Sequence, residues 1–191
     1  YEIKNYTEYI VGSEETEPGD GYTYDLWLGP VVAKGNMTAA ELGKAAVDGY
    51  SNHYQSIGQA STQSLLKSDA QDGFVPLVNA FVTAAMASGE KAQVKSAASA
   101  AQSYAVYDNK DLGHFLTLYS ASTRSADVKA KAAALKAYLN GTLIAHNRVN
   151  GKYTAANSQG LAVYLPGYSF NSDYNELAWA KAAQWDDLIK W

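Results

Sequence analysis

Five carboxylates lie close together near the start of the chain, and acidic clusters can bind cations or basic side chains. They fall within the twelve residues 14–25 and comprise Glu14, Glu15, Glu17, Asp20 and Asp25. A carboxylate pairs with a guanidinium through two hydrogen bonds and with an ammonium as a point charge. This loop can therefore recognise Arg or Lys. The alternative is a solvated turn, in which the same carboxylates have no partner.

The flanking residues indicate how the carboxylates are positioned. Ile10 and Val11 are β-branched and precede a Gly-Ser pair, which predicts the end of a buried strand at residues 10–13. Open α/β sheets often place ligands beyond such a strand end. Pro18-Gly-Asp-Gly21 is typical of a turn. Trp27 follows the loop and either lines a pocket or packs as a buried anchor, and we favour the anchor.

The run Ser13-Glu-Glu-Thr-Glu-Pro-Gly-Asp-Gly-Tyr22 resembles a segment of the clostripain-like cysteine peptidase family. Tyr1–Tyr9 and Gly160-Leu-Ala-Val-Tyr-Leu-Pro166 are similar to the family as well. In that family an Asp-Ala-Cys motif holds the nucleophile and a His-Gly motif holds the general base, both upstream of this run. Neither motif is present here. The resemblance thus covers nearly all of this chain but only the C-terminal part of the family's pattern.

The resemblance implies a caspase-like α/β fold, a layered sheet with flanking helices, of which this chain is the C-terminal part plus a helical region. Residues 1–191 are then one domain. It also implies a cysteine endopeptidase that cleaves after Arg or Lys. Asp20 matches the family's specificity aspartate for that residue. Its neighbours in the implied substrate-binding site are Thr16, Glu17, Gly19 and Trp27.

The chain has no cysteine, so it offers no thiolate nucleophile, disulfide or Cys-ligated zinc. We therefore expect no catalytic residue in these 191 residues and a His/Cys dyad on a preceding segment or a separate N-terminal chain. The partner is then a peptide or protein substrate with a basic residue before the scissile bond. The alternative function is non-enzymatic: an inactive peptidase-like domain or a helical module that binds basic peptides. The resemblance further implies a bacterial protein that is secreted or in the cell envelope.

Composition bounds the remaining functions. A net charge of −4, with 15 scattered basic residues, argues against nucleic acid as a partner. No apolar run approaches the roughly 18 residues of a membrane-spanning helix. No cofactor is expected. A weaker hypothesis is a Ca²⁺ site, because some family members depend on calcium and clustered carboxylates suit its oxygen coordination. The spacing matches no EF-hand, so we assign no metal ligands.

The rest of the chain alternates helical and strand patterns, which predicts an α/β layered domain. We expect the tail of a helix in 1–9 and an apolar stretch in 22–32 that Gly29-Pro30 breaks. Residues 61–67 alternate only weakly, and the resemblance implies a strand there. Thr38-Ala-Ala-Glu41 is a capping box for a helix over 39–54. Further helices are expected from about Gly73, over 90–105, 126–139 and 174–191, with a central strand over 160–166.

The histidines invite a third function. His114 lies near Asp111, as in a His-Asp catalytic pair. No Ser or Cys nucleophile of recognisable context accompanies them, so we predict a structural role for His114. His53 ends the buried face of the 39–54 helix and is also expected to be structural. His146 has no carboxylate near it in sequence, and we assign it no role.

Overall fold

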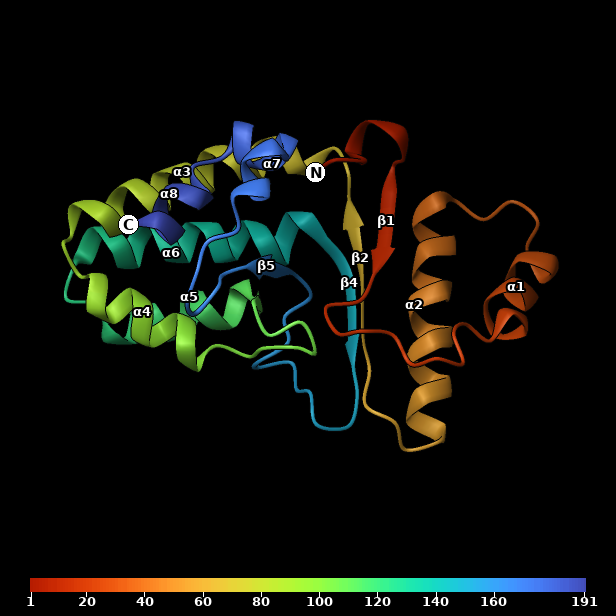
Figure 1. Cartoon of the computed structure of the whole chain (residues 1–191). Coiled ribbons are helices and arrows are strands. Elements are labelled where there is room, and N and C mark those ends of the chain that lie inside the picture. The colour runs from red at the N-terminus through yellow and green to blue at the C-terminus, as the bar shows by residue number, and fades with distance from the viewer.

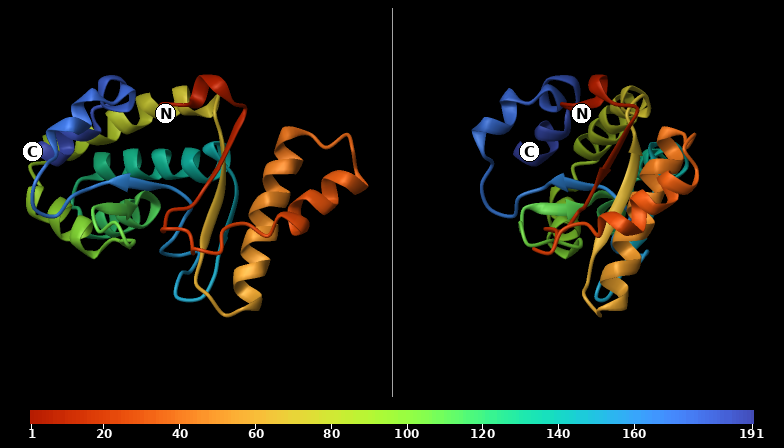
Figure 2. Two further views of the ribbon diagram at one scale, coloured as in Figure 1. Left: turned by 45° about the vertical axis from the view of Figure 1, so that its right-hand side comes forward. Right: turned by 90° about the vertical axis from the view of Figure 1, so that its right-hand side faces the viewer.

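The acidic loop leaves an antiparallel sheet that separates two groups of helices (Figure 1). The computed structural model describes residues 1–191. The sheet has the order β1-β2-β4, formed by Tyr9–Gly12, Thr62–Lys67 and Ile144–Val149. Helices α1 (Tyr24–Ala33) and α2 (Ala39–Ser56) lie on one side, and the larger helical region lies on the other. Figure 2 shows the same layers from two further directions. This is the layered α/β arrangement that the sequence predicts.

Strands β1 and β2 and helix α2 form where they were expected, and the capping box of α2 agrees with its packing. The Thr38 hydroxyl accepts a hydrogen bond from the Glu41 amide, and the Glu41 side chain bonds the Thr38 amide in return. Tyr50 and Tyr54 are buried along this helix. A Cβ at Gly43 would lie 2.4 Å from Leu65 Cδ1, so α2 packs closely on β2 at this glycine and a larger residue would displace the Leu65 side chain. The sheet is fully antiparallel, and the strand-end rule for parallel sheets does not apply to it.

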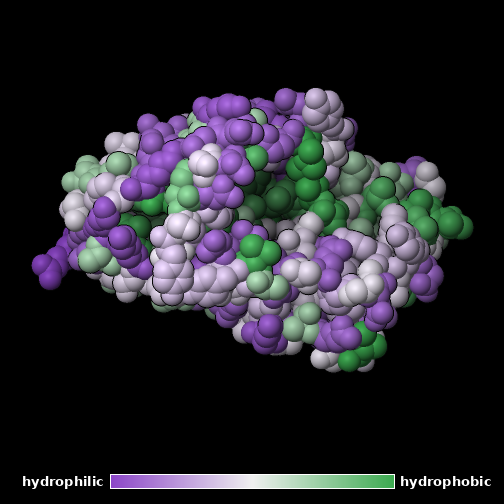
Figure 3. Space-filling model, in the orientation of Figure 1, coloured by the Kyte–Doolittle hydropathy of each residue, from purple (hydrophilic) through white to green (hydrophobic).

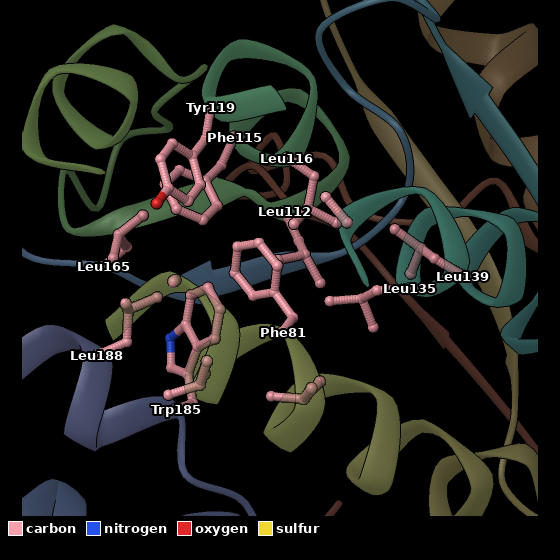
Figure 4. Close-up of a cluster of buried hydrophobic side chains, with 14 of the residues drawn as sticks. Phe81, Leu112, Phe115, Leu116, Tyr119, Leu135, Leu139, Leu165, Trp185 and Leu188 are labelled. Atoms are coloured by element: carbon pink, nitrogen blue, oxygen red, sulfur yellow. The ribbon is translucent and has the colours of Figure 1, made fainter. Parts of the chain in front are cut away.

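The hydrophobic core lies in the helical region (Figure 4). Five helices build it: α3 (Ala70–Ala87), α4 (Lys91–Ala100), α5 (Leu112–Ser122), α6 (Ala126–Tyr138) and α8 (Trp185–Lys190). The Phe81 ring stands edge-on to Phe115, with centroids 6.2 Å apart. Trp185 packs edge-on against Phe115 at 6.0 Å, and its indole N–H donates to the Tyr164 carbonyl at 2.8 Å. These contacts attach the C-terminal segment to α3 and α5.

The apolar run 160–166 is not a central strand. Its residues form β5 (Ala162–Tyr164), which pairs antiparallel with β3 (Asn109–Asp111) in a separate two-stranded sheet. The prediction failed because an apolar run indicates burial without indicating which strand will pair with it. Leu165 does reach the core, where it is 4% exposed.

The helix expected over 174–191 is divided into three pieces. They are η3 (Ser172–Glu176), α7 (Ala178–Ala182) and α8, with Leu177 and Ala183 in extended conformations between them. The breaks let two tryptophans reach different partners, since Trp179 stacks on Phe74 while Trp185 enters the core. In one continuous helix, the positions of the two rings relative to each other would be fixed by the helix.

The prediction of a helix tail over 1–9 is also wrong, because only the 3-10 turn η1 (Lys4–Tyr6) forms there. The three-residue spacing of Ile3, Tyr6 and Tyr9 suits a 3-10 turn as well as an α-helix. The N-terminus instead packs on α7, where the Glu2 carboxylate accepts the Ala178 and Trp179 amides at 3.0 and 2.9 Å.

Two prolines lie inside helices, contrary to expectation. Helix α1 runs through Pro30, and α3 begins at Ala70, so that Pro76 is interior. An interior proline costs about 3 kcal/mol. In α3 the cost is offset by a buried stripe, because each buried large apolar side chain contributes roughly 1.5–3 kcal/mol. The members of that stripe are Phe74, Val78, Phe81 and Val82.

Two shorter differences complete the comparison. Helix α4 ends at Ala100 instead of 105, because Ala101 is extended. After α6, Asn140-Gly141 lies in a π-helical turn, η2 (Leu139–Leu143), which leads directly into β4.

None of the helices has the length and apolar character that crossing a membrane requires.

Phe81→Ala tests the core. The ring is fully buried, and its loss is expected to lower the free energy of unfolding by about 3–5 kcal/mol, measured by urea denaturation. Phe81→Leu, which keeps most of the volume, is expected to cost roughly 1–2 kcal/mol. Val32→Ala, at a side chain that is 86% exposed, is the control and should stay within about 0.5 kcal/mol of wild type. Equal effects of Phe81→Ala and Val32→Ala would contradict this account.

Candidate functional site

The acidic loop is fastened to β2 at its first residues. The Thr62 hydroxyl, which is fully buried, accepts the amides of Glu14 and Glu15 at 3.1 and 3.0 Å. The Ser13 hydroxyl donates to the Thr62 carbonyl at 2.6 Å. Thr62 of β2 forms hydrogen bonds with three consecutive residues of the loop. These bonds fix the direction in which the loop leaves the sheet.

Glu14 points into the protein and not into solvent. It is 7% exposed, and its Oε2 accepts the Gly160 amide at 3.2 Å. Gly160 has φ +102°, and a Cβ there would lie 3.1 Å from Asn147 and Ile144 atoms, so the position requires glycine. The other oxygen, Oε1, is buried without a protein hydrogen-bond partner.

The group that faces Glu14 is a second buried carboxyl, Asp111. Asp111 is fully buried and accepts the amides of His114 at 2.5 Å and Gln159 at 2.6 Å. Burial, followed by the proximity of Asp111, raises the pKa of Glu14 far above its ordinary range. The raised pKa favours the protonated form of Glu14 at neutral pH.

Glu15 is held by a different set of hydrogen-bond donors from those of Glu14. Its Oε1 accepts the amides of Thr16 at 2.7 Å and Ala105 at 2.8 Å, and its Oε2 accepts the Tyr153 hydroxyl. Burial works against the charged form, but these hydrogen bonds outweigh it and lower the pKa of Glu15. Glu15 thus stays ionised and ties the loop to the segment that follows α4.

The far end of the loop is also fixed. Glu17 accepts hydrogen bonds from Tyr22 at 3.1 Å and from the Gln63 amide group at 3.3 Å. Burial, with the charge of Glu17, raises the pKa of Tyr22 above the usual tyrosine range. The Tyr54 hydroxyl donates to the carbonyl of Gly21, which sits at φ +66°. The solvated-turn alternative is therefore wrong for Glu14 and Glu15, whereas Glu17 is exposed and accepts hydrogen bonds from neighbouring side chains.

The residues that this anchoring leaves at the surface include most of the expected substrate site. Thr16, Glu17, Gly19 and Asp20 are exposed in the loop between β1 and α1. Trp27 lies in α1, half-buried, with its indole N–H buried and without an acceptor. Their role in binding substrate stays a prediction. Sequence reasoning missed the anchors, because Thr62, Tyr54 and Tyr153 are distant in the chain and carry no motif.

The histidines do not form a catalytic pair with a carboxylate and a nucleophile. The His114 ring accepts the Gln102 amide at its Nδ1, 3.0 Å away, while Asp111 bonds the His114 backbone as the N-cap of α5. His146 does have a carboxylate partner that the sequence did not reveal: its Nε2 lies 2.8 Å from Asp48, which also binds Arg148 at 2.9 Å. His53 packs edge-on against Tyr54.

The carboxylates are dispersed instead of converging. Glu14 and Glu15 face different partners, and no group of three or more His, Asp or Glu side chains is placed to hold a metal ion. The calcium site stays a prediction, and the arrangement of the side chains offers no set of ligands for it.

Solved structures with the same fold are cysteine proteases. A clostripain from Bacteroides thetaiotaomicron ATCC 29148, in complex with the peptide inhibitor BTN-VLTK-AOMK, matches with a TM-score of 0.70 and 18% identity over 94% of this chain and 78% of that chain. A secreted C11 cysteine protease from Bacteroides thetaiotaomicron, in complex with an irreversible peptide inhibitor, has a TM-score of 0.68 and 14% identity over 98% and 55%. An inactive zymogen C11 protease from Parabacteroides distasonis has a TM-score of 0.65 and 18% identity over 95% of this chain and 54% of that chain. This chain thus spans about half the length of the latter two.

These likenesses define the class by fold alone: a caspase-like α/β domain with an added helical region, as the sequence predicted. The family follows from a sequence model described as the clostripain family, which matches residues 1–191. The chain belongs to the clostripain family of cysteine peptidases. No curated protein sequence matches it.

The protonated state of Glu14 can be tested through stability. A carboxyl whose pKa is raised by folding contributes stability that is fully present below its ordinary value of 4.5 and is lost as the pH rises toward the folded-state pKa. We expect the unfolding free energy of wild type, relative to Glu14→Gln, to fall between pH 5 and 8, by at most about 1.4 kcal/mol per pH unit. Urea unfolding at several pH values measures this difference. Glu176→Gln, at an exposed carboxylate, is the control, and an equal slope in both comparisons would refute the raised pKa of Glu14.

Proposed function

We propose that this chain is part of a clostripain-like cysteine endopeptidase that cleaves after Arg or Lys, and that it supplies the acidic loop that binds the basic residue. The observation that carries the proposal is the position of Asp20. Its carboxylate is exposed at the tip of a loop whose two ends are fixed by Thr62 and Tyr54. A fixed carboxylate binds a guanidinium or ammonium without first losing loop entropy.

Two further observations support a basic substrate residue. The exposed carboxylates around Asp20 include Glu17 and Asp25, and no cation pairs with them in the structure. The inhibitor bound to the related clostripain has the peptide sequence VLTK, which ends in lysine. Asp20 then acts as the charge partner, with Thr16, Glu17 and Gly19 beside it and Trp27 in the following helix.

The nucleophile and general base must come from residues outside these 191, since the chain has no cysteine. The proposed source is an N-terminal segment or chain that carries the His/Cys dyad. Strand β1 is at the edge of its sheet, so its outer backbone groups are available to a further strand. Beside it lies an apolar groove of about 380 Å³ between β1, β2, β5 and the N-terminal residues, and Figure 3 shows hydrophobic surface at this hollow. We propose that this groove receives the dyad-bearing segment.

The complete enzyme is proposed to act outside the cytoplasm, secreted or in the cell envelope. Support comes from a matched Bacteroides thetaiotaomicron protease that is described as secreted. The alternative function, a module that binds basic peptides without cleaving them, uses the same loop and differs only in turnover.

Asp20→Asn tests the specificity role in the enzyme that contains both this chain and the dyad. Removing one partner of a desolvated charge pair costs about 2–5 kcal/mol, so kcat/KM for Arg and Lys reporter peptides is expected to fall about 30-fold or more. Asp25→Asn, at an exposed carboxylate in the first turn of α1, is the matched control and should change kcat/KM less than about 3-fold. Unchanged kinetics in Asp20→Asn would reject the assignment. Loss of peptide binding by Asp20→Asn in a protein without turnover would establish the binding module instead.

Ile3→Asp tests the groove. Ile3 lines the groove and is 53% exposed, so a carboxylate there should weaken docking of the dyad-bearing segment without unfolding the chain. We expect co-purification of that segment with residues 1–191 to fall about ten-fold, equivalent to ~1.4 kcal/mol. Val106→Asp, at a residue that is 57% exposed and away from the groove, is the control. Full retention in both variants would place the dyad-bearing segment elsewhere.

A further inference from the structure

A second cavity, separate from the acidic loop, lies between α4, α8 and the segment that follows β5. Its volume is about 320 Å³, which is at the lower end of the range for small-molecule sites. The walls are mainly apolar and aromatic and include Leu165, Phe170, Ile189 and Trp191. None of the expected substrate-site residues lines it.

The charge of this cavity has one sign. Three lysines, Lys91, Lys95 and Lys110, line it, and no carboxylate does. Lys91 and Lys95 are exposed at the rim, while Lys110 is 1% exposed. The cavity is therefore lined by one buried lysine and two solvent-exposed lysines.

Lys110 lacks the partner that a buried cation needs. Its Nζ is buried and makes no hydrogen bond, and its nearest charge-stabilising contact is the Tyr107 ring, whose centroid is 3.7 Å away. Burial lowers the pKa of Lys110, and the charge of nearby Asp108 opposes this only in part. An unpaired buried ammonium is unfavourable by several kcal/mol. An anion in the cavity would supply the missing hydrogen bonds and charge.

We propose that this cavity binds a small organic carboxylate, with its anionic group at Lys110 and an apolar or aromatic body against Leu165, Phe170 and Trp191. The same chemistry is present in a free aromatic acid and in the C-terminal carboxylate of a peptide that ends in an apolar residue. The site is independent of the proposed peptidase function, because it shares no residue with the acidic loop.

The proposal predicts discrimination by charge. Calorimetric titration of the purified protein with 3-phenylpropionate and with its neutral isostere 3-phenylpropionamide should give at least about ten-fold tighter binding of the acid, since hydrogen bonds to a charged group are the stronger ones.

Lys110→Met keeps the length of the side chain and removes its charge. It should reduce the affinity for 3-phenylpropionate about ten-fold and abolish the preference over the amide. Lys131→Met, at an exposed lysine on α6, is the control and should leave both unchanged. If Lys110→Met does not fold, Lys95→Met at the rim provides the test, with a smaller expected loss of about three-fold.

A peptide arm separates the two sources of the carboxylate. Gly-Gly-Phe with a free carboxyl terminus should bind at least as tightly as 3-phenylpropionate if the site receives peptide ends, and about ten-fold more weakly if it receives only free acids. Equal affinity for acid and amide, or no binding of the acid at about 10 mM, would overturn the proposal. Lys110 would then be a structural lysine that the Tyr107 ring stabilises.

Discussion

Two carboxyl groups, Glu14 and Asp111, share a site from which water is largely excluded, and this pair constrains much of the structure. Burial and the proximity of Asp111 raise the pKa of Glu14 and favour its protonated form. Asp111 accepts two backbone amides, and one of these begins α5. Glu14 in turn accepts a hydrogen bond from the Gly160 amide ahead of β5. The two carboxyl groups therefore link the acidic loop, α5 and β5, which are far apart in sequence.

The division between apolar and polar contacts follows from this arrangement. The aromatic core around Phe81 and Trp185 stabilises the helical region, but it does not touch the acidic loop. The loop is instead positioned by directional hydrogen bonds to Thr62, Tyr153 and Tyr54. Hydrogen bonds fix direction better than apolar packing does, since their strength falls steeply with angle. This property would suit the role that we propose for Asp20 in binding a basic substrate residue.

The sequence predicted α2, where the capping box and the buried face agree, whereas β2 was expected from the resemblance because its own alternation is weak. It failed where tertiary contacts decide. The Trp179 and Trp185 partners divide the last helix, and pairing with β3 moves 162–164 out of the main sheet. At the candidate site, residue type and resemblance led to the acidic loop and to the proposal for Asp20. The inward turn of Glu14 was not, because nothing within 13–22 indicates that Asp111 and Gly160 will face it.

Strand β3 separates the two unusual ionisable groups of the molecule. Successive side chains of a strand point to opposite faces, so Lys110 and its neighbour Asp111 cannot reach the same space. Lys110 faces the apolar cavity, while Asp111 faces Glu14. A register shifted by one residue would exchange the faces of these two side chains, so that the lysine would point toward Glu14 and the carboxylate toward the cavity. The antiparallel pairing of β3 with β5, Lys110 opposite Val163 and Asp111 opposite Ala162, is what keeps the acid pair and the basic cavity distinct.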